Sequence, residues 1–519
     1  MVFILENCAG KESEKERAEN IIKIVRVLAK HQEVEGETIR EKLRFLIRHI
    51  EKHIDKSEWQ DEYIKVFWSG VKQGELTEGA WNLIQSETEE KILSKIEVDA
   101  SPIAKLCDID CGIFSNADYL SEKYIELIPE SKRNALHIKK GNGIFILTEE
   151  EVKQLLADDP EGSIIKKTYK NSDIDNYFIN TAQEIKYLLY IDDDFKQENY
   201  PQITKHLENF KDVLQARLER YGEKYPWYRL HRPHKRSIYE SPKIVTSRWG
   251  KQNLYAIQNG NFFENSDINL YIPKPETKES LEYILGLLNS RLLNYWMEYK
   301  GRGEGVTRQI RLQKIPIRRI NFGNLQEVQM HNKIVDKVKG ITERMIELSG
   351  YLNYFNGIRL TRLNPGDSLP EVNPEAIVKT LPTTKQFSLR THPDIKSTYP
   401  QDFEEIRFIL DKVGKIDLTL KGPELKLISK DRKIIFIEGE EGLLHIISLI
   451  LENHKNESWN SIKELPLIPE SAGDYENKKK EVIEKVITLR TEIQRLQASI
   501  DEIVFKLYGV SDNTVEINK

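Results

Sequence analysis

The strongest periodic signal in the chain lies near its C-terminal end, where apolar residues recur at alternating four- and three-residue spacing. The pattern comprises Val482, Val486, Leu489, Ile493, Leu496, Ile500, Ile503 and Leu507. Such spacing is typical of a helix that buries a narrow apolar stripe against another helix. Residues 325–349 repeat it at Ile334, Val338, Ile341, Met345 and Leu348. We therefore expect two long helices that pair with each other in antiparallel orientation.

The chain has 519 residues, enough for several domains, and changes in apolar spacing suggest their boundaries. Residues 1–97 carry apolar stripes at helical spacing, which predicts an N-terminal helical domain. Residues 98–320 mix helical segments with short apolar runs bounded by turn residues, which indicates a mixed α/β domain. Residues 321–355 predict a long spacer helix, residues 356–460 a linker plus a small β-rich domain, and residues 461–519 a C-terminal coiled-coil helix and tail. The expected fold class is α+β and multidomain.

Individual elements are expected inside these segments. The mixed domain is predicted to contain strands at 143–147, 187–191 and 243–246 and helices at 202–221 and 281–299. The β-rich domain is predicted to contain a small antiparallel meander at 415–420, 424–428 and 433–438, which a helix at 442–453 could cover.

Composition excludes several classes of protein. Cys8, Cys107 and Cys111 are too few for a disulfide framework, and the sequence has no Cys-x-x-Cys pair. The N-terminus lacks the basic and apolar regions of a secretory signal, and no stretch is long and apolar enough to span a membrane. We therefore expect a cytoplasmic protein.

Positive charge is concentrated in short blocks, although the whole chain carries a net charge of -5. The first block, residues 225–236, contains no acidic residue, and Pro226 and Pro233 keep it out of a helix. Cations beside aromatic rings on a loop suit contact with phosphates and bases, whereas a solvated charged loop is the plain alternative. The candidate DNA-binding residues are Trp227, Tyr228, Arg229, His231, Arg232, His234, Lys235 and Arg236.

Two further segments offer side chains of the same kind. The residues that follow the strand predicted at 243–246 include Arg248, Trp249, Lys251, Gln252 and Asn253. Arginine, glutamine and asparagine can make paired hydrogen bonds to base edges. A Gly-rich loop and the basic stretch after it add Arg302, Arg308, Gln309, Arg311 and Lys314. Such a cationic strand face suits a phosphate clamp. An ordinary polar hairpin end and an exposed strand face remain the alternatives.

Two other residue sets could carry metal chemistry. Asp417, Glu424 and Lys426 stand in the order found in many metal-dependent nucleases, although charged alternating strands often produce it by chance. His49 and His53 are four residues apart, as zinc-binding pairs on helices are, but no third ligand is evident and a surface helix is the simpler interpretation. A metal-dependent DNA nuclease and a coiled-coil scaffold with non-specific DNA affinity are therefore alternative functions.

An ordered series of short motifs resembles the TaqI-like target-recognition domain of adenine-specific DNA methyltransferases and type IIG restriction-modification enzymes. The motifs lie at residues 109–118, 141–147, 169–174 (Tyr-Lys-Asn-Ser-Asp-Ile), 243–248, 261–263, 281–296 and 314–317, with a further segment at 500–509. The resemblance implies a domain at 98–320 that binds double-stranded DNA and recognises a sequence.

The sequence departs from that family in its catalytic motifs. The methyltransferases carry an Asn-Pro-Pro-Tyr/Phe motif for the target adenine and a Gly-rich turn for S-adenosylmethionine. Here the Asn-Pro pairs at Asn364 and Asn373 lack the second proline. The resemblance thus implies a specificity subunit of a restriction-modification or related phage-defence system, not an enzyme by itself and without a bound cofactor. S-adenosylmethionine is expected on a separate partner methyltransferase. Helices at 325–349 and 480–508 are expected to dock that partner, and a nuclease where one is present.

Overall fold

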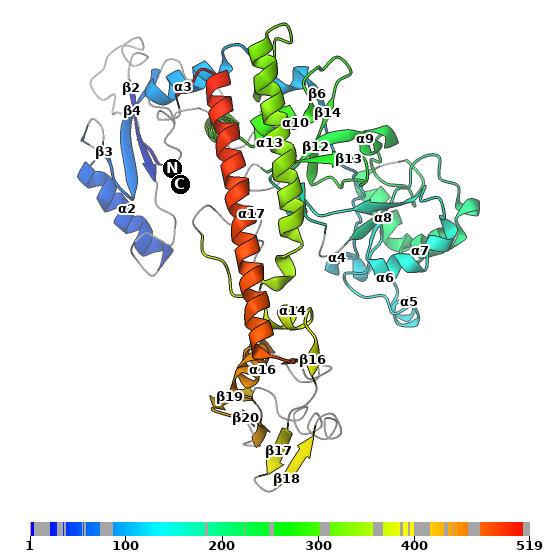
Figure 1. The fold of residues 1–519 in the computed structure, drawn as a ribbon. Helices are drawn as coiled ribbons and strands as arrows, with labels where there is room; N and C mark the ends of the chain where they lie inside the picture. The colour runs from blue at the N-terminus through cyan, green and yellow to red at the C-terminus, as the bar shows by residue number, and fades with distance from the viewer. Residues whose placement is uncertain are drawn as a thin grey trace. The chain divides into compact units, whose positions relative to one another are not determined.

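The computed structural model describes residues 2–4, 21–27, 35, 38–53, 55–56, 59–72, 87–181, 185–222, 224–248, 254–301, 312–355, 367–384, 388–392, 395–398, 416–429, 434–438, 440–454 and 468–511. The chain is mixed α+β, as predicted (Figure 1). It divides into two compact units, one of residues 1–342 with 496–519 and one of residues 343–495. Each unit is described by itself. None of the described helices has both the length and the apolar character that crossing a bilayer requires.

The N-terminal region contains an antiparallel sheet, so the predicted N-terminal helical domain is wrong. The region comprises β1 (Val2–Ile4), β2 (Ile21–Val27), α2 (Ile39–His53), β3 (Trp59–Gln60) and β4 (Ile64–Lys72), with strand order β1-β2-β4-β3. Helix α3 (Glu87–Glu97) follows. The helical prediction is confirmed for α2 and fails for β2, β3 and β4.

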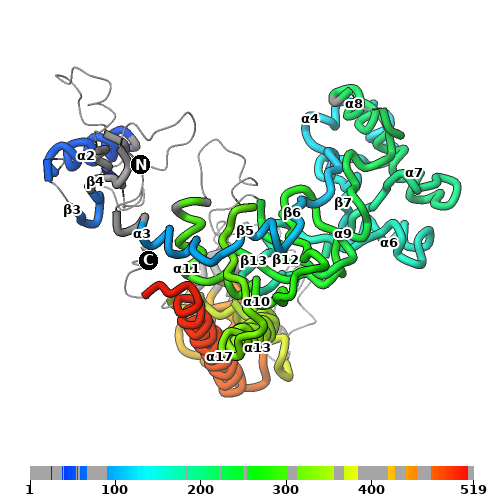
Figure 2. Tube along the Cα trace, turned by 90° about the horizontal axis from the view of Figure 1, so that it is seen from above, coloured from blue at the N-terminus to red at the C-terminus, as the bar shows by residue number. Residues whose placement is uncertain are grey.

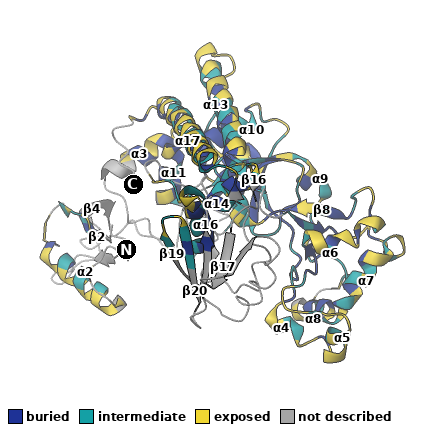
Figure 3. Ribbon diagram, turned by 60° about the horizontal axis from the view of Figure 1, so that its bottom comes forward, coloured by how far each residue is buried: buried dark blue, intermediate teal, exposed yellow. Residues whose placement is uncertain are grey.

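Side-chain shape explains this difference. Isoleucine and valine dominate β2, and branching at Cβ favours the extended backbone of a strand. In β4, Ile64 and Val66 are buried whereas Lys65 between them is partly exposed, which is the period of two of a half-buried strand. Val25 of β2 and Ile50 of α2 complete this small core. Exposed residues predominate along the rest of α2 (Figure 3).

A four-stranded antiparallel sheet forms the middle of the first unit. Its strands are β6 (Cys107–Cys111), β12 (Pro242–Ser247), β13 (Tyr255–Asn259) and β14 (Ile268–Pro273), in the order β13-β12-β14-β6. Strand β12 confirms the strand predicted at 243–246 and is buried from Lys243 to Thr246, as a central strand covered on both faces should be. Figure 2 shows β6, β12 and β13 near one another although they are far apart in sequence.

Shorter elements surround this sheet. The strands are β5 (Ala100–Pro102), which pairs with β15 (Pro316–Arg318), β7 (Ile146–Leu147), β8 (Ile165–Thr168) and β11 (Lys186–Leu189) in the order β7-β11-β8, and β9 (Ile174–Asp175) with β10 (Phe178–Ile179). The helices are α4 (Glu122–Ile125), α5 (Glu130–Ala135), α6 (Glu149–Lys153), α7 (Pro201–Asn209), α8 (Lys211–Tyr221) and α9 (Arg236–Glu240). The helix predicted at 202–221 is thus split at Phe210, and the strands predicted at 143–147 and 187–191 appear with shifted ends as β7 and β11.

The apolar helix predicted at 281–299 is also divided. Helix α10 (Leu281–Leu288) is followed by α11 (Arg291–Trp296), which continues as a π turn over Met297–Gly301. At the break, the Asn289 side chain accepts from Tyr255 N at 3.2 Å and donates to Tyr255 O at 2.9 Å. These two bonds tie the end of α10 to the edge strand β13.

Gly286 allows α10 to approach α13 (Leu325–Ser349) closely. A Cβ atom at residue 286 would lie 2.5 Å from Ile334 Cγ2 and 3.1 Å from Val338 Cγ2. Gly286→Ala is therefore expected to destabilise the protein by about 1–3 kcal/mol in urea denaturation, because the helices must move apart. Gly323→Ala is the control. Its Cβ would approach Asn321 Oδ1 at 3.2 Å, in an exposed turn where that side chain can move. An unchanged midpoint for Gly286→Ala would contradict the close packing.

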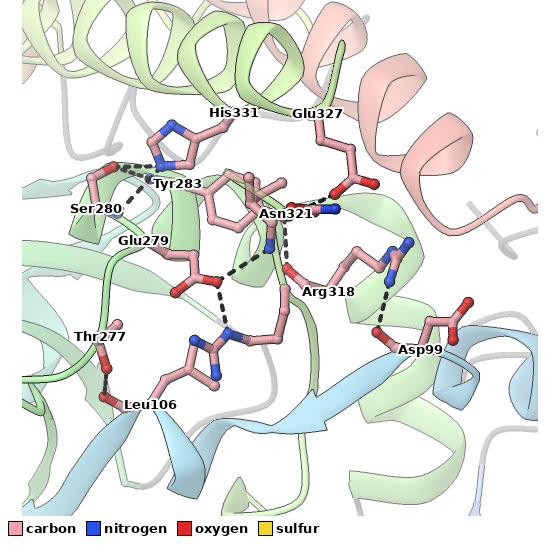
Figure 4. A network of polar contacts seen from close by, with 12 residues as sticks. Asp99, Leu106, Thr277, Glu279, Ser280, Tyr283, Arg318, Asn321, Glu327 and His331 are labelled. Atoms are coloured by element: carbon pink, nitrogen blue, oxygen red, sulfur yellow. Dashed lines mark hydrogen bonds and ion pairs between the residues drawn. The ribbon is translucent and has the colours of Figure 1, made fainter. Parts of the chain in front are cut away.

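Polar contacts hold Arg318 and Arg319, at and just after the end of β15, in place (Figure 4). The buried Glu279 carboxylate accepts a hydrogen bond from Arg319 Nε at 2.7 Å. Arg318 Nη1 donates to Asp99 O at 2.9 Å, and the Tyr283 hydroxyl donates to Arg318 O at 2.8 Å. Arg318 and Arg319 are therefore engaged within the fold.

The second unit contains a five-stranded antiparallel sheet. Its strands are β17 (Ser388–His392), β18 (Ile395–Thr398), β19 (Ile416–Lys421), β20 (Glu424–Ser429) and β21 (Ile434–Glu438), in the order β18-β17-β21-β20-β19. Strands β19, β20 and β21 occupy the three segments for which a meander was predicted, and β17 and β18 extend the sheet. The unit also contains α14 (Pro374–Val378), α16 (Glu441–His454) and the pair β16 (Thr383–Thr384) and β22 (Ile468–Pro469).

The two long helices predicted from heptad spacing are α13 and α17 (Ala472–Leu507). Within the second unit, Arg344 forms an ion pair with Glu492, and Lys485 Nζ lies 2.7 Å from Glu347 Oε1. Residue numbers rise along one helix as they fall along the other, so the helices run antiparallel here. Leu348, Val482, Val486 and Leu489 share one buried cluster between them. Antiparallel pairing is therefore present in this unit, and a coiled-coil supercoil stays a prediction.

Candidate nucleic-acid interface

A polar hollow in the first unit brings together residues from separate stretches of the chain. It is lined by Ile109, Asp110, Cys111, Phe114, Arg232, His234, Arg248 and Gln313. Cys111 ends β6, and Arg248 directly follows β12 of the same sheet. Arg232 comes from the basic loop at 225–236. Two arginines that the sequence analysis selected in different segments therefore face one site.

Arg232 is held at the hollow by its backbone. Phe114 N donates to Arg232 O at 3.1 Å, and Arg232 N donates to Phe114 O at 2.9 Å. The guanidinium carbon lies 5.8 Å from the Phe114 ring centroid, within cation–π range. Because Arg232 is exposed, its backbone is fixed while its guanidinium can reach a phosphate or a base.

Arg248 is positioned by the turn after β12. Its backbone N–H donates to Asp267 O at 2.7 Å, and its Nη1 lies 3.5 Å from Ser266 O. Burial and then Asp110 raise the pKa of the Cys111 thiol, whereas Arg248 and Arg232 lower it. Both guanidinium groups therefore lie near the end of β6, in a hollow that Asp110 also lines.

Asp110, Cys111 and His234 contribute groups of metal-binding type to this hollow. Their ligand atoms lie within 4.8 Å of one another, and His234 Nδ1 is 3.7 Å from Asp110 Oδ2. The neighbouring Arg232 and Arg248 would repel a dication. The Asp110 carboxylate offsets part of the positive charge of the two arginines in this hollow.

A buried arginine that the sequence analysis did not select organises the basic loop. Arg217 of α8 is fully buried and donates to Ser115 O at 2.6 Å, Trp227 O at 3.0 Å and Arg229 O at 2.8 Å. It lies on a helix with little apolar asymmetry, so no local pattern distinguishes it from exposed arginines. Arg217 thus fixes the backbone from which Arg232 projects.

Several predicted DNA-binding residues of this loop have partners inside the fold. Arg229 Nε lies 2.6 Å from Asp193 Oδ1, so a distant acidic residue neutralises it. Arg236 donates to Ser163 O at 2.9 Å and lies 3.8 Å from Glu240. Residues 225–236 contain no acidic residue, but Asp193 and Glu240 supply counter-ions from outside this block. DNA contact by Arg229 and Arg236 stays a prediction.

The other loop residues divide between packed and exposed positions. Trp227 and Tyr228 are partly buried against the apolar core, and His231 Nδ1 is 2.9 Å from the Tyr225 hydroxyl. Lys235 is exposed at the start of α9. Lys235 and Arg232 are therefore the loop cations best placed for phosphate.

The remaining predicted contacts fall elsewhere. Lys314 lines a different hollow, with Glu97, Trp296 and Lys300. Its neighbour Gln313, which belongs to the same basic stretch, lines the hollow of Arg232 and Arg248. Outside the described residues lie Trp249, Lys251, Gln252, Asn253, Arg302, Arg308, Gln309 and Arg311.

The register of β19 and β20 bears on the nuclease alternative. Asp417 is opposite Ile428, whereas Glu424 is opposite Lys421. Glu424 therefore lies four residues along β20 from the position facing Asp417, a backbone separation of roughly 13 Å at 3.3 Å per residue. Paired carboxylates that share a divalent ion must meet at its coordination sphere, and this register does not place the two residues opposite each other.

Comparison with known protein families bears on the same segment. A family model for the TaqI-like C-terminal specificity domain matches residues 166–317. The chain contains a TaqI-like specificity domain. The match includes Arg232, His234, Arg248 and Gln313 of the hollow, whereas the β6 side of the hollow precedes it. The resemblance noted from short motifs is confirmed.

Two type II methyltransferases of Haemophilus influenzae are similar to the chain over a limited stretch. M.HincII is 27% identical over 169 residues, which cover 30% of this chain and 33% of that protein. M.HindII is 25% identical over 186 residues, which cover 33% of this chain and 35% of that protein. The chain therefore spans about a third of the length of these relatives.

Solved structures give weaker similarity. The type IIL restriction-modification enzyme MmeI in complex with DNA has 13% identity and a TM-score of 0.29, covering 48% of this chain and 29% of that one. The type IIG restriction endonuclease BpuSI has 16% identity and a TM-score of 0.32, covering 62% and 35%. Scores this low carry no argument about the arrangement of this chain.

The specificity domain contains a buried pair of ionisable side chains, Lys243 and Glu264. Lys243 Nζ lies 3.7 Å from Glu264 Oε1, and both side chains are fully buried. Gln258 Nε2 donates to Glu264 Oε1 at 2.8 Å, and Ile113 N donates to Glu264 O at 2.8 Å. Burial raises the pKa of Glu264 and lowers that of Lys243. Lys243 belongs to β12, and Glu264 binds Ile113, which follows β6. The pair therefore connects these two parts of the domain.

The C-terminal helix contacts the specificity domain through Asp501. Its carboxylate accepts from Arg291 N at 2.8 Å, and burial raises its pKa to about 6. Because this pKa exceeds the unfolded value of about 3.9, Asp501 contributes less stability as pH rises from about 4 to about 6. Asp501→Asn should remove this loss and gain up to about 3 kcal/mol over wild type by about pH 7. Urea denaturation of both proteins at about pH 4 and about pH 7 measures their free energies of unfolding. A difference between variant and wild type that is equal at the two pH values would contradict the raised pKa of Asp501.

Proposed function

We propose that this chain is the DNA-sequence-recognition component of a restriction-modification system. The observation that carries the proposal is the convergence of Arg232 and Arg248 on one hollow of a TaqI-like specificity domain. Arginine pairs with the O6 and N7 acceptors of guanine in the major groove, and exposed cations such as Lys235 neutralise phosphates. The named relatives, which are type II methyltransferases, support the same class of function.

Selection from random duplexes tests this proposal. The full chain should enrich one short sequence, and its binding to that sequence should exceed non-specific binding by about a thousandfold or more at a stated salt concentration. Weak binding that is equal for all sequences and falls steeply with salt would support the scaffold alternative and reject sequence recognition.

We further propose that methyl transfer is supplied from outside these residues. The chain lacks an Asn-Pro-Pro-Tyr/Phe motif, so S-adenosylmethionine would be bound by a methyltransferase partner. The long helices offer a docking surface, since Ile346 on α13 and Ile487 on α17 are 55% and 49% exposed. A partner that covers both side chains would bury apolar surface that now faces water.

Purification from the native host tests this arrangement. A methyltransferase with the adenine-specific motif should co-purify in equal amount with the wild-type chain, as measured by mass spectrometry. It should be lost from the double variant Ile346→Glu and Ile487→Glu, while the exposed substitution Lys196→Glu in the first unit should retain it. A chain that methylates DNA without a partner would contradict the proposal.

A further inference from the structure

A side-chain cluster in the N-terminal region, remote in sequence from the specificity domain, contains groups of metal-binding type. His49 and His53 lie one turn apart on α2, and Asp61 lies in the turn between β3 and β4. The ligand atoms of these residues all lie within 4.8 Å of one another. The sequence suggested the histidine pair but no third ligand, and the fold supplies it.

Asp61 is held by backbone amides through one oxygen, and its other oxygen, Oδ2, lies beside His49 and accepts a hydrogen bond from Trp59 Nε1 at 3.4 Å. Its Oδ1 accepts from Tyr63 N at 2.8 Å and Ile64 N at 2.9 Å, which fixes the carboxylate. Its Oδ2 lies 2.5 Å from His49 Nε2. The carboxylate of Asp61 is therefore held in place beside the two histidines.

The surroundings of His53 give independent support for a bound ligand. It is only 7% exposed, and its ring stacks on Trp59 with centroids 4.4 Å apart and an interplanar angle of 8°. Its Nδ1 is buried and has no hydrogen-bond partner among the residues that the structure describes. Its ring centroid lies 4.9 Å from that of His49. A buried imidazole without a polar partner is costly unless something outside the described contacts satisfies it.

We propose that His49, His53 and Asp61 form a binding site for one zinc ion. Two imidazoles from adjacent helical turns and one carboxylate are ligands that zinc prefers, and three protein ligands leave a fourth position for water or an anion. His49 also lines an open hollow with Arg44, Arg48 and Lys52. His49 thus lies beside cations that would attract an anionic ligand to the fourth position, although these cations also repel the metal. This site is independent of DNA sequence recognition.

Metal titration of the full-length chain, stripped with chelator, tests the site. Zinc should bind with a stoichiometry of one in competition with a chromophoric chelator, and cobalt should give the visible absorption of a tetrahedral site. Asp61→Asn and His53→Ala should weaken zinc binding by roughly a hundredfold or more, at or beyond the upper end of what changes to outer-shell partners cause. His49→Gln should do the same while keeping a hydrogen bond to Asp61, so it separates metal loss from unfolding, with far-UV circular dichroism as the check.

Cys111→Ser is the matched control, because Asp110, Cys111 and His234 are the other metal-type cluster among the described residues. This variant should bind zinc as the wild type does. Zinc binding that disappears with Cys111→Ser but persists in His49→Gln would overturn the assignment. An absence of zinc binding to the wild-type chain would leave His49 and Asp61 as an ion pair that joins α2 to the β3–β4 turn, and would also overturn it.

Discussion

Arg248→Ala is expected to weaken binding of the preferred duplex by about 1–3 kcal/mol, or roughly tenfold to a hundredfold, and to relax specificity at one base pair. The effect follows from the position of Arg248 directly after β12, where its backbone is fixed by Asp267 O and its side chain faces the hollow. Competition binding against a panel of single-base variants of the selected site measures both changes.

Two further substitutions and one control distinguish contact with a base from contact with a phosphate. Arg248→Lys keeps the charge but loses the paired donors of guanidinium, so it should resemble alanine if the contact is to a base and wild type if it is to a phosphate. Arg232→Ala should weaken all sequences more uniformly, because Arg232 is exposed and suited to phosphate. Arg495→Ala, an exposed arginine of α17, is the charge-matched control. Equal affinities of Arg248→Ala and wild type for every duplex would rule out the proposed contact.

Arg217→Met is expected to destabilise the specificity domain by about 3 kcal/mol and to abolish sequence-specific binding as well. Methionine fills much of the same volume but leaves the carbonyl oxygens of Ser115, Trp227 and Arg229 without their common donor. Each charge-assisted bond to a buried carbonyl is worth about 1.5–3 kcal/mol, and desolvation of the guanidinium offsets part of the sum. Urea denaturation measures the loss of stability.

Hydrogen exchange separates the role of Arg217 in the loop from its role in the core. Amides of residues 224–236 should exchange faster in Arg217→Met even under conditions where the domain remains folded, because the loop loses its anchor. Arg220→Met changes an exposed arginine on the same helix and should leave exchange in the loop unchanged. Normal protection of residues 224–236 in Arg217→Met would show that the loop holds its shape without this residue.

Periodicity predicted the elements whose burial follows from local spacing. Helices α13 and α17 carry heptad stripes that are the same whatever lies beside them, and β12 is an apolar run bounded by turn residues. Periodicity failed for β2 and β4, because a few apolar residues spaced three or four apart also occur by chance in strands. Their hydrogen-bonded pairing with each other, across more than thirty intervening residues, decided between the two.

The sequence by itself determined the specificity domain, through an ordered set of motifs, and identified Arg232 and Arg248 as candidate contacts. Tertiary structure alone decided which cations are engaged. Asp193 neutralises Arg229 from 36 residues away, and Arg217 is buried under the loop. It also placed Asp61 beside His49 and His53. The physical reason is that side-chain spacing encodes which face of an element is buried, whereas electrostatic and metal-ligand partnerships depend on distances between elements, which chain folding sets.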